Sequence, residues 1–198
     1  MVHLCLDFEG VLIPEIWQCL AKEVNSDDLM LTTQDLKDYD ELMSLRMKVV
    51  NEKNIKLSDI QKIVRDINPF EGAQEFLDWA RSKFQVTIVS DTFYELAWPL
   101  VEKLGYPSII CHNMTIENDK ITGYKLRQPN NKQKVIEALQ SLKFKVFASG
   151  DSYNDINMLN TADLGIFFQA PKHIKEEYPH LLTASSHNEL KKILEEHI

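Results

Sequence analysis

The sequence is poor in the residues that would support a cross-linked or nucleic-acid-binding protein. Its 198 residues include only three cysteines and six glycines. Cys5, Cys19 and Cys111 lack C-x-x-C or metal-ligand spacing, and their odd number argues against a disulfide framework. No basic cluster of five or more residues occurs, and the net charge is -8, whereas nucleic-acid binders are normally basic. We therefore expect no nucleic-acid partner.

Long apolar segments are also missing. No run of about 18 apolar residues exists, so we expect no membrane-spanning helix. The N-terminal apolar run contains Asp7 and Glu9, which argues against a signal peptide. Unpaired thiols fit a reducing compartment, and we expect a cytoplasmic protein. Hydrophobic residues at 44% and charged residues at 26% are typical of a globular protein with one core, or one domain plus a small insert.

The first apolar run ends in two acids. His3 to Leu6 is followed by Asp7-Phe8-Glu9-Gly10. This pattern predicts a buried parallel strand whose carboxyl end delivers acids into a crevice, where open α/β sheets bind ligands. Asp7 is a candidate nucleophile, and Glu9 a candidate proton donor if Gly10 turns the backbone. An Asp and a Glu that only cap a turn would give the same short pattern.

A second buried strand is predicted over residues 85–92, and it ends in Ser90-Asp91-Thr92. Thr92 and Glu95 have the spacing of a capping box, which predicts a helix start at this point. The first amides of such a helix, beside the Ser90 hydroxyl, form an anion site. Further on, Lys132 opens another predicted helix. Taken alone, Ser90 fits an ordinary turn and Lys132 a solvated surface charge.

A third buried strand, residues 144–149, leads into Gly150-Asp151-Ser152-Tyr153-Asn154-Asp155. Asp151 follows the strand as Asp7 follows the first, so the two carboxylates can share a hard cation such as Mg²⁺. Ser152 and Asp155 can cap the next helix. A capped turn without a metal remains the alternative.

Between the first two sheet strands the sequence changes to a helical pattern. Apolar stripes recur from residue 14 to 68, and Ser58 to Gln61 reads as a capping box for the last helix. Shorter strands are predicted over 108–111, 113–117, 121–126 and 164–168, with the middle two forming a hairpin, and an amphipathic helix after Ser186. We therefore predict an α/β fold: a doubly wound, mainly parallel core from residues 1–13 and 69–198, with a small helical cap at 14–68.

The order of these motifs resembles the haloacid dehalogenase (HAD) superfamily of phosphatases and phosphotransferases over essentially the whole chain. Asp7 to Val11, Pro14 to Trp17, Ser90 to Glu95 and Gly150 to Asp155 are most similar to the family of phosphoserine phosphatases and phosphoserine:homoserine phosphotransferases. One departure from the wider superfamily is Glu9, where an aspartate is usual. A glutamate reaches one methylene further, which alters the position of the proton donor.

The resemblance implies a role for each matching residue. Asp7 would form an aspartyl-phosphate, and Glu9 would protonate the leaving oxygen and then activate the acceptor. Further implied roles are Mg²⁺ binding by Asp7, the Glu9 backbone carbonyl and Asp151, phosphate binding by Ser90, Asp91, Thr92 and Lys132, and substrate binding by Glu15, Arg46 and Asn154. The implied small-molecule substrates are O-phospho-L-serine and, as acceptor, water or L-homoserine; the sequence predicts no oligomeric state.

Two other functions remain open at this point. A HAD phosphatase of another small phosphomonoester would keep the same mechanism, because specificity resides in the cap and only Glu15 and Arg46 address the amino-acid part. A receiver-like module that accepts phosphate on an aspartate without turnover also uses acids at strand ends. The long helical segment and an acceptor candidate on the first strand argue against that module.

Overall fold

The computed structural model describes residues 1–32, 35–36 and 38–198. These residues form a seven-stranded sheet with the order β4-β3-β2-β1-β5-β6-β7. The strands are β1 (Val2–Leu6), β2 (Gln85–Phe93), β3 (Ile109–Glu117), β4 (Lys120–Lys125), β5 (Lys145–Gly150), β6 (Leu164–Phe168) and β7 (Leu182–Ala184). Neighbours pair in parallel except β3 with β4. The predicted α/β fold with a mainly parallel sheet is confirmed.

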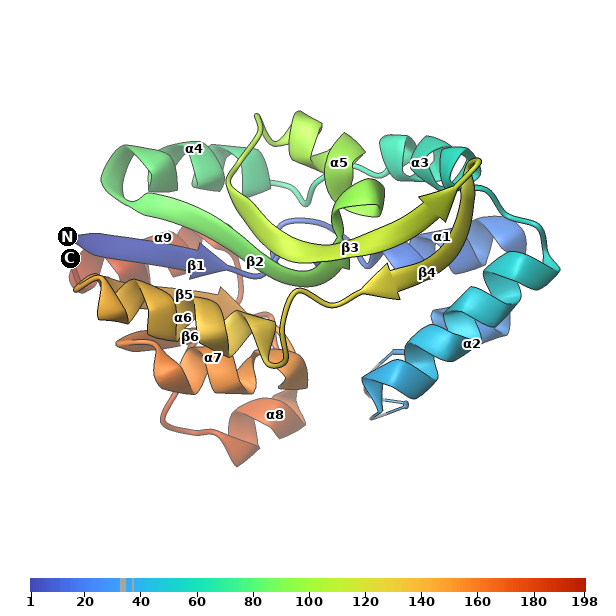
Figure 1. Cartoon of the computed structure of the whole chain (residues 1–198). Coiled ribbons are helices and arrows are strands. Elements are labelled where there is room, and N and C mark those ends of the chain that lie inside the picture. The colour runs from blue at the N-terminus through green and yellow to red at the C-terminus, as the bar shows by residue number, and fades with distance from the viewer. Residues whose placement is uncertain (33–34, 37) are drawn as a thin grey trace.

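Helices cover both faces of the sheet (Figure 1). They are α4 (Ala73–Lys83), α5 (Tyr94–Lys103), α6 (Asn131–Ser141), α7 (Ile156–Thr161), α8 (Lys172–Glu177) and α9 (His187–Glu196), with the short 3-10 helix η2 at Tyr153–Asp155. Side chains alternate along β1: Leu4 and Leu6 belong to the apolar cluster with α4 and α9, whereas Cys5 belongs to the cluster with α6 and α7. This alternation is the period-two pattern of a strand buried on both faces.

The chain reverses its direction of winding at β1. From β1 it runs outward through β2 and β3, and after α6 it returns to the other side of β1 with β5 and β6. The carboxyl end of β1 is therefore the topological switch point, where doubly wound sheets open a crevice for ligands. Asp7 follows β1 directly at this point.

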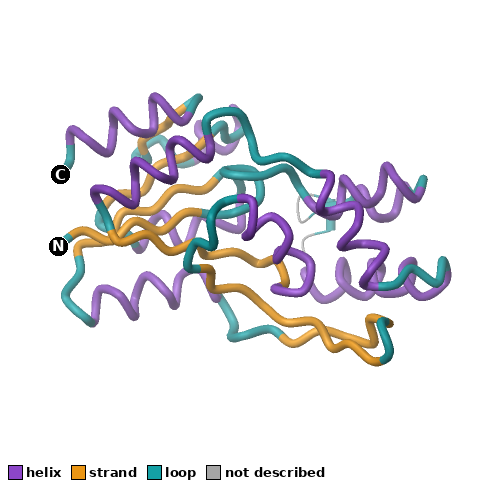
Figure 2. Tube along the Cα trace, turned by 90° about the horizontal axis from the view of Figure 1, so that it is seen from above, coloured by secondary structure: helices purple, strands orange, loops and turns teal. Residues whose placement is uncertain are grey.

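Residues between β1 and α4 form helices α1 (Ile16–Val24), α2 (Tyr39–Glu52) and α3 (Leu57–Asp66) with the 3-10 helix η1 (Asp27–Met30). We call these four elements the insert helices. They lie together at the end of the sheet opposite the chain termini, beside the β3–β4 hairpin (Figure 2). The predicted helical character of this segment is confirmed, but α3 begins one residue before Ser58, and the Ser58 hydroxyl binds Asp119 (2.6 Å) instead of capping it.

The structure corrects several predicted boundaries. Residues 109–117 form the single strand β3 instead of two, and the short elements α8 and β7 were not predicted. The proposed Thr92 cap is wrong, because β2 continues to Phe93 and α5 begins at Tyr94. The Glu95 carboxylate instead accepts a hydrogen bond from the Met114 amide (2.8 Å), a long-range contact that joins α5 to β3.

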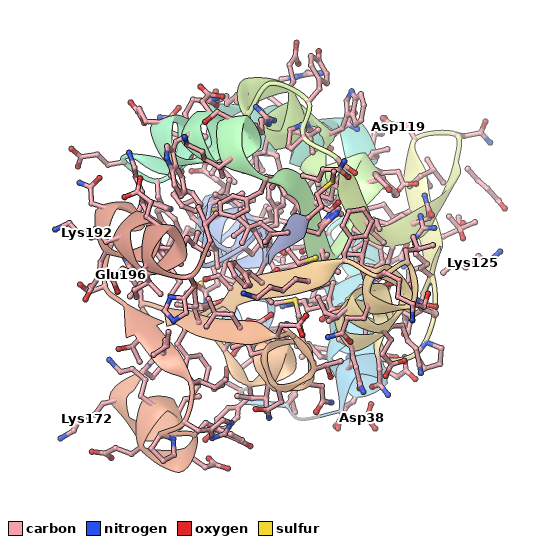
Figure 3. All side chains as sticks on the ribbon, turned by 90° about the vertical axis from the view of Figure 1, so that its left-hand side faces the viewer. Asp38, Asp119, Lys125, Lys172, Lys192 and Glu196 are labelled. Atoms are coloured by element: carbon pink, nitrogen blue, oxygen red, sulfur yellow. The ribbon has the colours of Figure 1, made fainter. Side chains whose placement is uncertain are left out.

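Charged side chains such as Lys125, Lys172 and Lys192 extend outward from the fold (Figure 3). Ion pairs such as Lys48 with Glu52 and Lys172 with Glu176 join exposed side chains one helical turn apart. Within the described part of the chain, no helix combines the length and hydropathy needed to cross a bilayer.

Candidate active site

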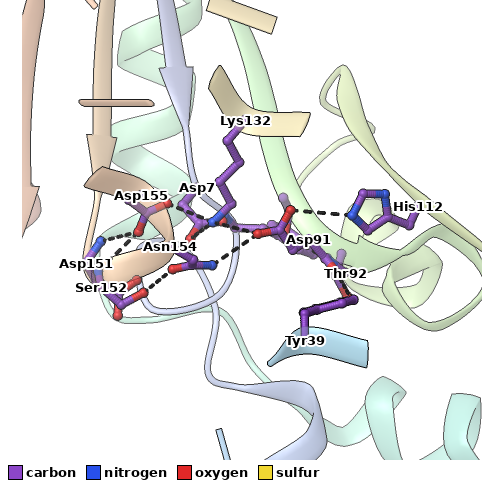
Figure 4. Close-up of polar contacts among 12 residues, drawn as sticks. Asp7, Tyr39, Asp91, Thr92, His112, Lys132, Asp151, Ser152, Asn154 and Asp155 are labelled. Atoms are coloured by element: carbon purple, nitrogen blue, oxygen red, sulfur yellow. Dashed lines mark hydrogen bonds and ion pairs between the residues drawn. The ribbon is translucent and has the colours of Figure 1, made fainter. Parts of the chain in front are cut away.

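A buried lysine and two buried acids form the centre of the site. Lys132 Nζ lies 2.8 Å from Asp7 Oδ2 and 2.7 Å from Asp155 Oδ1 (Figure 4). All three residues are at most 3% exposed. Burial alone would lower the pKa of Lys132, but the carboxylates of Asp155, Asp7 and Asp91 raise it well above its usual value. The ammonium therefore stays charged and holds the Asp7 carboxylate in one orientation.

Two glycines permit the acids to approach so closely. Gly10 has a φ of +78°, which favours glycine, and a Cβ at this position would collide with the Asp151 carboxylate. A Cβ at Gly150 would collide with Asp155. The turn after β1 is closed by a hydrogen bond from the Gly10 amide to the Ile13 carbonyl (2.8 Å). Gly10 thus supplies the turn that the sequence pattern required.

Asp7, Asp151 and Asp155 can each offer a carboxylate oxygen, and these oxygens lie within 4.8 Å of one another. Burial and the nearby Asp155 charge raise the pKa of Asp7 well above its ordinary value and that of Asp151 to about 7. A divalent cation among these oxygens would relieve the repulsion, and oxygen donors are the ligands that Mg²⁺ prefers. The residues present therefore fit a magnesium ion.

The carboxyl-terminal end of β2, which pairs with β1, carries Ser90, Asp91 and Thr92 next to Asp7. The Ser90 hydroxyl accepts a hydrogen bond from the Thr92 amide (3.2 Å), and among the described residues the buried Thr92 Oγ1 has no partner. Asp91 is 3.8 Å from Lys132 and is also bound by Asn154 Nδ2 (3.2 Å). Burial would raise the pKa of Asp91, but these contacts and the hydrogen bond from His112 bring it below its ordinary value.

His112 was not among the predicted site residues. Its Nδ1 accepts a hydrogen bond from the Arg127 amide (3.1 Å), so the proton resides on Nε2, which lies 3.4 Å from Asp91 Oδ1. The imidazole is 3% exposed and comes from β3. No local pattern in the sequence marks it, because its partners come from distant parts of the chain.

The acids near the insert helices have a separate environment. Glu9 Oε1 accepts a hydrogen bond from the Ile16 amide at the start of α1 (2.7 Å). Burial and the charge of Glu15 nevertheless raise the pKa of Glu9 to about 8, so it carries a proton at neutral pH. Burial likewise raises the pKa of Glu15, while the Arg46 charge opposes that shift. Glu9 therefore has the protonation state of a general acid.

Arg46 from α2 is buried with only part of its hydrogen-bonding capacity used. Its guanidinium stacks 4.9 Å from the Trp17 ring centroid, and Nη2 donates to the Leu31 carbonyl (3.1 Å). Within the described residues, Nε has no partner. A partly satisfied buried guanidinium is suited to bind a carboxylate through two parallel hydrogen bonds.

These residues surround a cavity of about 70 Å³, which we call the inner cavity. Every predicted site residue except Asp151 lines it: Asp7, Glu9, Glu15, Arg46, Ser90, Asp91, Thr92, Lys132 and Asn154. Asp151 belongs to the acidic cluster with Asp7 and Asp155. Tyr39 also lines the cavity and, like Asp155, was not predicted as a site residue; the G-D-S-Y-N-D motif contains Asp155, but the sequence indicated only a helix cap.

Comparison with known proteins assigns the class. The family of haloacid dehalogenase-like hydrolases matches residues 11–160, so the chain belongs to this family. The match begins at Val11 and therefore does not include Asp7 or Glu9.

Within this family, the chain is similar to proteins named phosphoserine phosphatase. The chain is 46% identical over 189 residues to a protein of Pseudomonas aeruginosa named phosphoserine phosphatase ThrH, covering 95% of this chain and 92% of the relative. A phosphoserine phosphatase of Pseudomonas syringae is equally similar, at 46% over 189 residues, with 95% and 80% covered. The solved structure of an apo phosphoserine phosphatase superposes with a TM-score of 0.78 at 22% identity and covers 98% of this chain and 97% of that one, which shows the shared fold.

Proposed function

We propose that this protein is a Mg²⁺-dependent phosphoserine phosphatase that transfers the phosphoryl group through Asp7 to water or to L-homoserine. The observation that carries the proposal is the buried Asp7 carboxylate, held by Lys132 at the switch point of the sheet and clustered with Asp151 and Asp155. The names of the two relatives at 46% identity support phosphoserine as the substrate.

In the first step an Asp7 carboxylate oxygen forms a bond to phosphorus while the bond from phosphorus to the serine oxygen breaks. Glu9, protonated at neutral pH, gives its proton to that oxygen. Lys132, the Ser90 and Thr92 hydroxyls and the amides of Asp91 and Thr92 would bind the phosphoryl oxygens, since this transfer depends on positioning and on neutralisation of charge.

In the second step Glu9 takes a proton from water or from the homoserine hydroxyl, whose oxygen then attacks phosphorus and releases Asp7. The products are inorganic phosphate or O-phosphohomoserine. Mg²⁺ would be held by Asp7, the Glu9 backbone carbonyl and Asp151, with Asp155 beside them, and it would neutralise charge on the phosphoryl group.

We assign the amino-acid part of the substrate to Glu15, Arg46 and Asn154. The Glu15 carboxylate would accept hydrogen bonds from the ammonium group of phosphoserine. The Arg46 guanidinium, whose Nε has no partner among the described residues, would bind the carboxylate of phosphoserine. Residues 14–68 would act as a cap on the core formed by 1–13 and 69–198, and its closure would exclude bulk water during transfer.

The test is phosphate release from O-phospho-L-serine by the full chain, with Mg²⁺ or with a chelator, and with or without L-homoserine. We expect Mg²⁺-dependent release, and formation of O-phosphohomoserine at the expense of phosphate when homoserine is added. If only inorganic phosphate forms when homoserine is present, the proposed transfer to homoserine would be contradicted. Turnover of other small phosphomonoesters without turnover of phosphoserine would contradict the proposed substrate.

A further inference from the structure

A second, much larger cavity lies next to the inner one. This outer cavity has a volume of about 830 Å³, against about 70 Å³ for the inner cavity. Sites for small molecules commonly have volumes of about 300 to 1,000 Å³. Four residues line both cavities, namely Tyr39, Asp91, Lys132 and Asn154, so they form the boundary between them.

Three of these boundary residues lie outside the insert and contact one another. Lys132 and Asn154 both lie against Asp91, at 3.8 and 3.2 Å. The fourth, Tyr39, comes from the insert as the first residue of α2. Its hydroxyl donates to the Asp91 backbone carbonyl (3.1 Å), and its ring meets the His112 ring edge-on at 6.5 Å between centroids. Figure 4 shows Tyr39 approaching the Asp91–Thr92 segment from the insert side.

We propose that Tyr39 is a specificity-determining residue that limits the size of the leaving group by closing the inner cavity toward the outer one. The inference rests on the proposed phosphatase function. Since Lys132, Asp91 and Asn154 are fixed by mutual contacts, the Tyr39 ring is the boundary element whose removal joins the two cavities. A phosphomonoester too long for the inner cavity would then extend into the outer one.

The lining of the outer cavity defines the leaving group that would fit. Lys132 is committed to Asp7, Asp155 and Asp91, and Asp91 is in turn bound by Lys132, Asn154 and His112. The Glu177 carboxylate also lines the cavity, where the neutral Tyr153 hydroxyl donates to it (2.8 Å). Its charge favours a long leaving group that ends in an ammonium over one that ends in a carboxylate.

The experiment compares O-phosphotyramine, whose leaving group carries a ring and an ammonium, with O-phospho-L-serine. The ratio of their kcat/KM values is measured for the wild type, Tyr39→Ala and Tyr39→Phe. Intrinsic reactivity of the two esters cancels when this ratio is compared between enzymes. We expect the ratio to rise about tenfold or more in Tyr39→Ala, since filling or emptying a pocket by even one methylene changes discrimination by about 10- to 200-fold.

The matched control is Tyr39→Phe, which keeps the ring and removes only the hydrogen bond to Asp91. Its ratio is expected to stay within about twofold of the wild type. An equal rise in both variants would assign the effect to that hydrogen bond and overturn the size argument. An unchanged ratio in a folded Tyr39→Ala, or in Tyr39→Leu if the alanine variant does not fold, would also overturn it. Failure of the wild type to hydrolyse phosphoserine would instead contradict the proposed function.

Discussion

Glu9 and Asp7 are separated in sequence only by Phe8, yet they have different surroundings. Asp7 is held by Lys132 and by the Phe8 amide, which lies 2.7 Å from Oδ1. Glu9 faces the start of α1 and has a pKa of about 8. Two carboxyl groups with different hydrogen-bond partners can divide the roles of nucleophile and acid between them.

Replacing Glu9 by Gln removes the proton that the leaving serine oxygen needs. We expect kcat for phosphoserine to fall by about 10²- to 10⁴-fold, the usual contribution of a general acid. Steady-state phosphate release measures this change.

In the wild type, kcat/KM should fall as the pH rises through about 8, because Glu9 then loses its proton. A fully active Glu9→Gln variant would exclude Glu9 as the proton donor.

Arg46 distinguishes an amino-acid substrate from other phosphomonoesters. Arg46→Ala should raise KM for phosphoserine by about tenfold or more, because a hydrogen bond to a charged group contributes about 1.5 to 3 kcal/mol. O-Phosphoethanolamine lacks the carboxylate and serves as the control, with no comparable increase. Equal losses for both substrates would show that Arg46 acts through structure alone, for example through its packing on Trp17.

At this scale, the sequence predicted residues that directly follow a strand or open a helix. Asp7, Asp151 and Lys132 were identifiable because the carboxyl ends of parallel strands meet at one edge. His112 and Tyr39 were not, because their contacts with Asp91 connect segments far apart in sequence. The individual catalytic and binding roles remain predictions.

At the scale of elements, the β3–β4 hairpin is fastened to the insert at two places. Asp119 in the turn accepts hydrogen bonds from the Ser58 amide (3.0 Å) and hydroxyl (2.6 Å) at the start of α3. On β4, the Tyr124 hydroxyl donates to Asp40 Oδ1 in α2 (2.8 Å). The hairpin therefore contacts two different insert helices, and its turn accepts hydrogen bonds from the Leu57 and Ser58 amides at the start of α3.

Asp119→Asn tests this fastening while keeping a residue that tolerates the left-handed backbone at this position (φ 67°). The hydrogen bonds from Ser58 lower the pKa of Asp119 below 3.8. A lowered folded-state pKa gives stability that is present above the ordinary value and is lost as the pH falls through the lowered one. The wild type should therefore unfold at higher urea concentration than the variant near pH 7.

The difference between the two urea midpoints should shrink as the pH falls below 3.8 and the Asp119 carboxylate becomes protonated. A difference that does not change with pH would show that the carboxylate charge plays no part in the contact. The sequence predicted the hairpin from its Asn118-Asp119-Lys120 turn, but it did not reveal that the same turn binds α3, since that partner lies 61 residues away.

At the scale of the whole molecule, apolar periodicity predicted the order of strands and helices well. Alternating and continuous apolar runs mark β1, β2, β5 and β6, which are buried on both faces. The short β7 and α8 lack such a pattern, because three and six residues are too few to establish a period.

If the insert acts as a cap, binding of substrate should lower the solvent exposure of the amides in the insert helices. Phosphoserine with Mg²⁺ is expected to slow hydrogen exchange at amides of α1 and α2, which carry Trp17 and Arg46 at the inner cavity. Amides of α9, which contributes no residue to the lining of the inner cavity, provide the internal control. Equal exchange in α1 and α2 with and without the ligands would contradict closure.

The central claim is that Asp7 carries the phosphoryl group. The most direct measurement is to quench the enzyme during turnover of phosphoserine, reduce the acyl phosphate with borohydride and locate the modified residue by mass spectrometry. Reduction of an aspartyl-phosphate converts the aspartate to homoserine, and we predict this change at position 7 and its loss in Asp7→Asn. Continued turnover with the modification at another residue, or in a folded Asp7→Asn variant, would contradict the account.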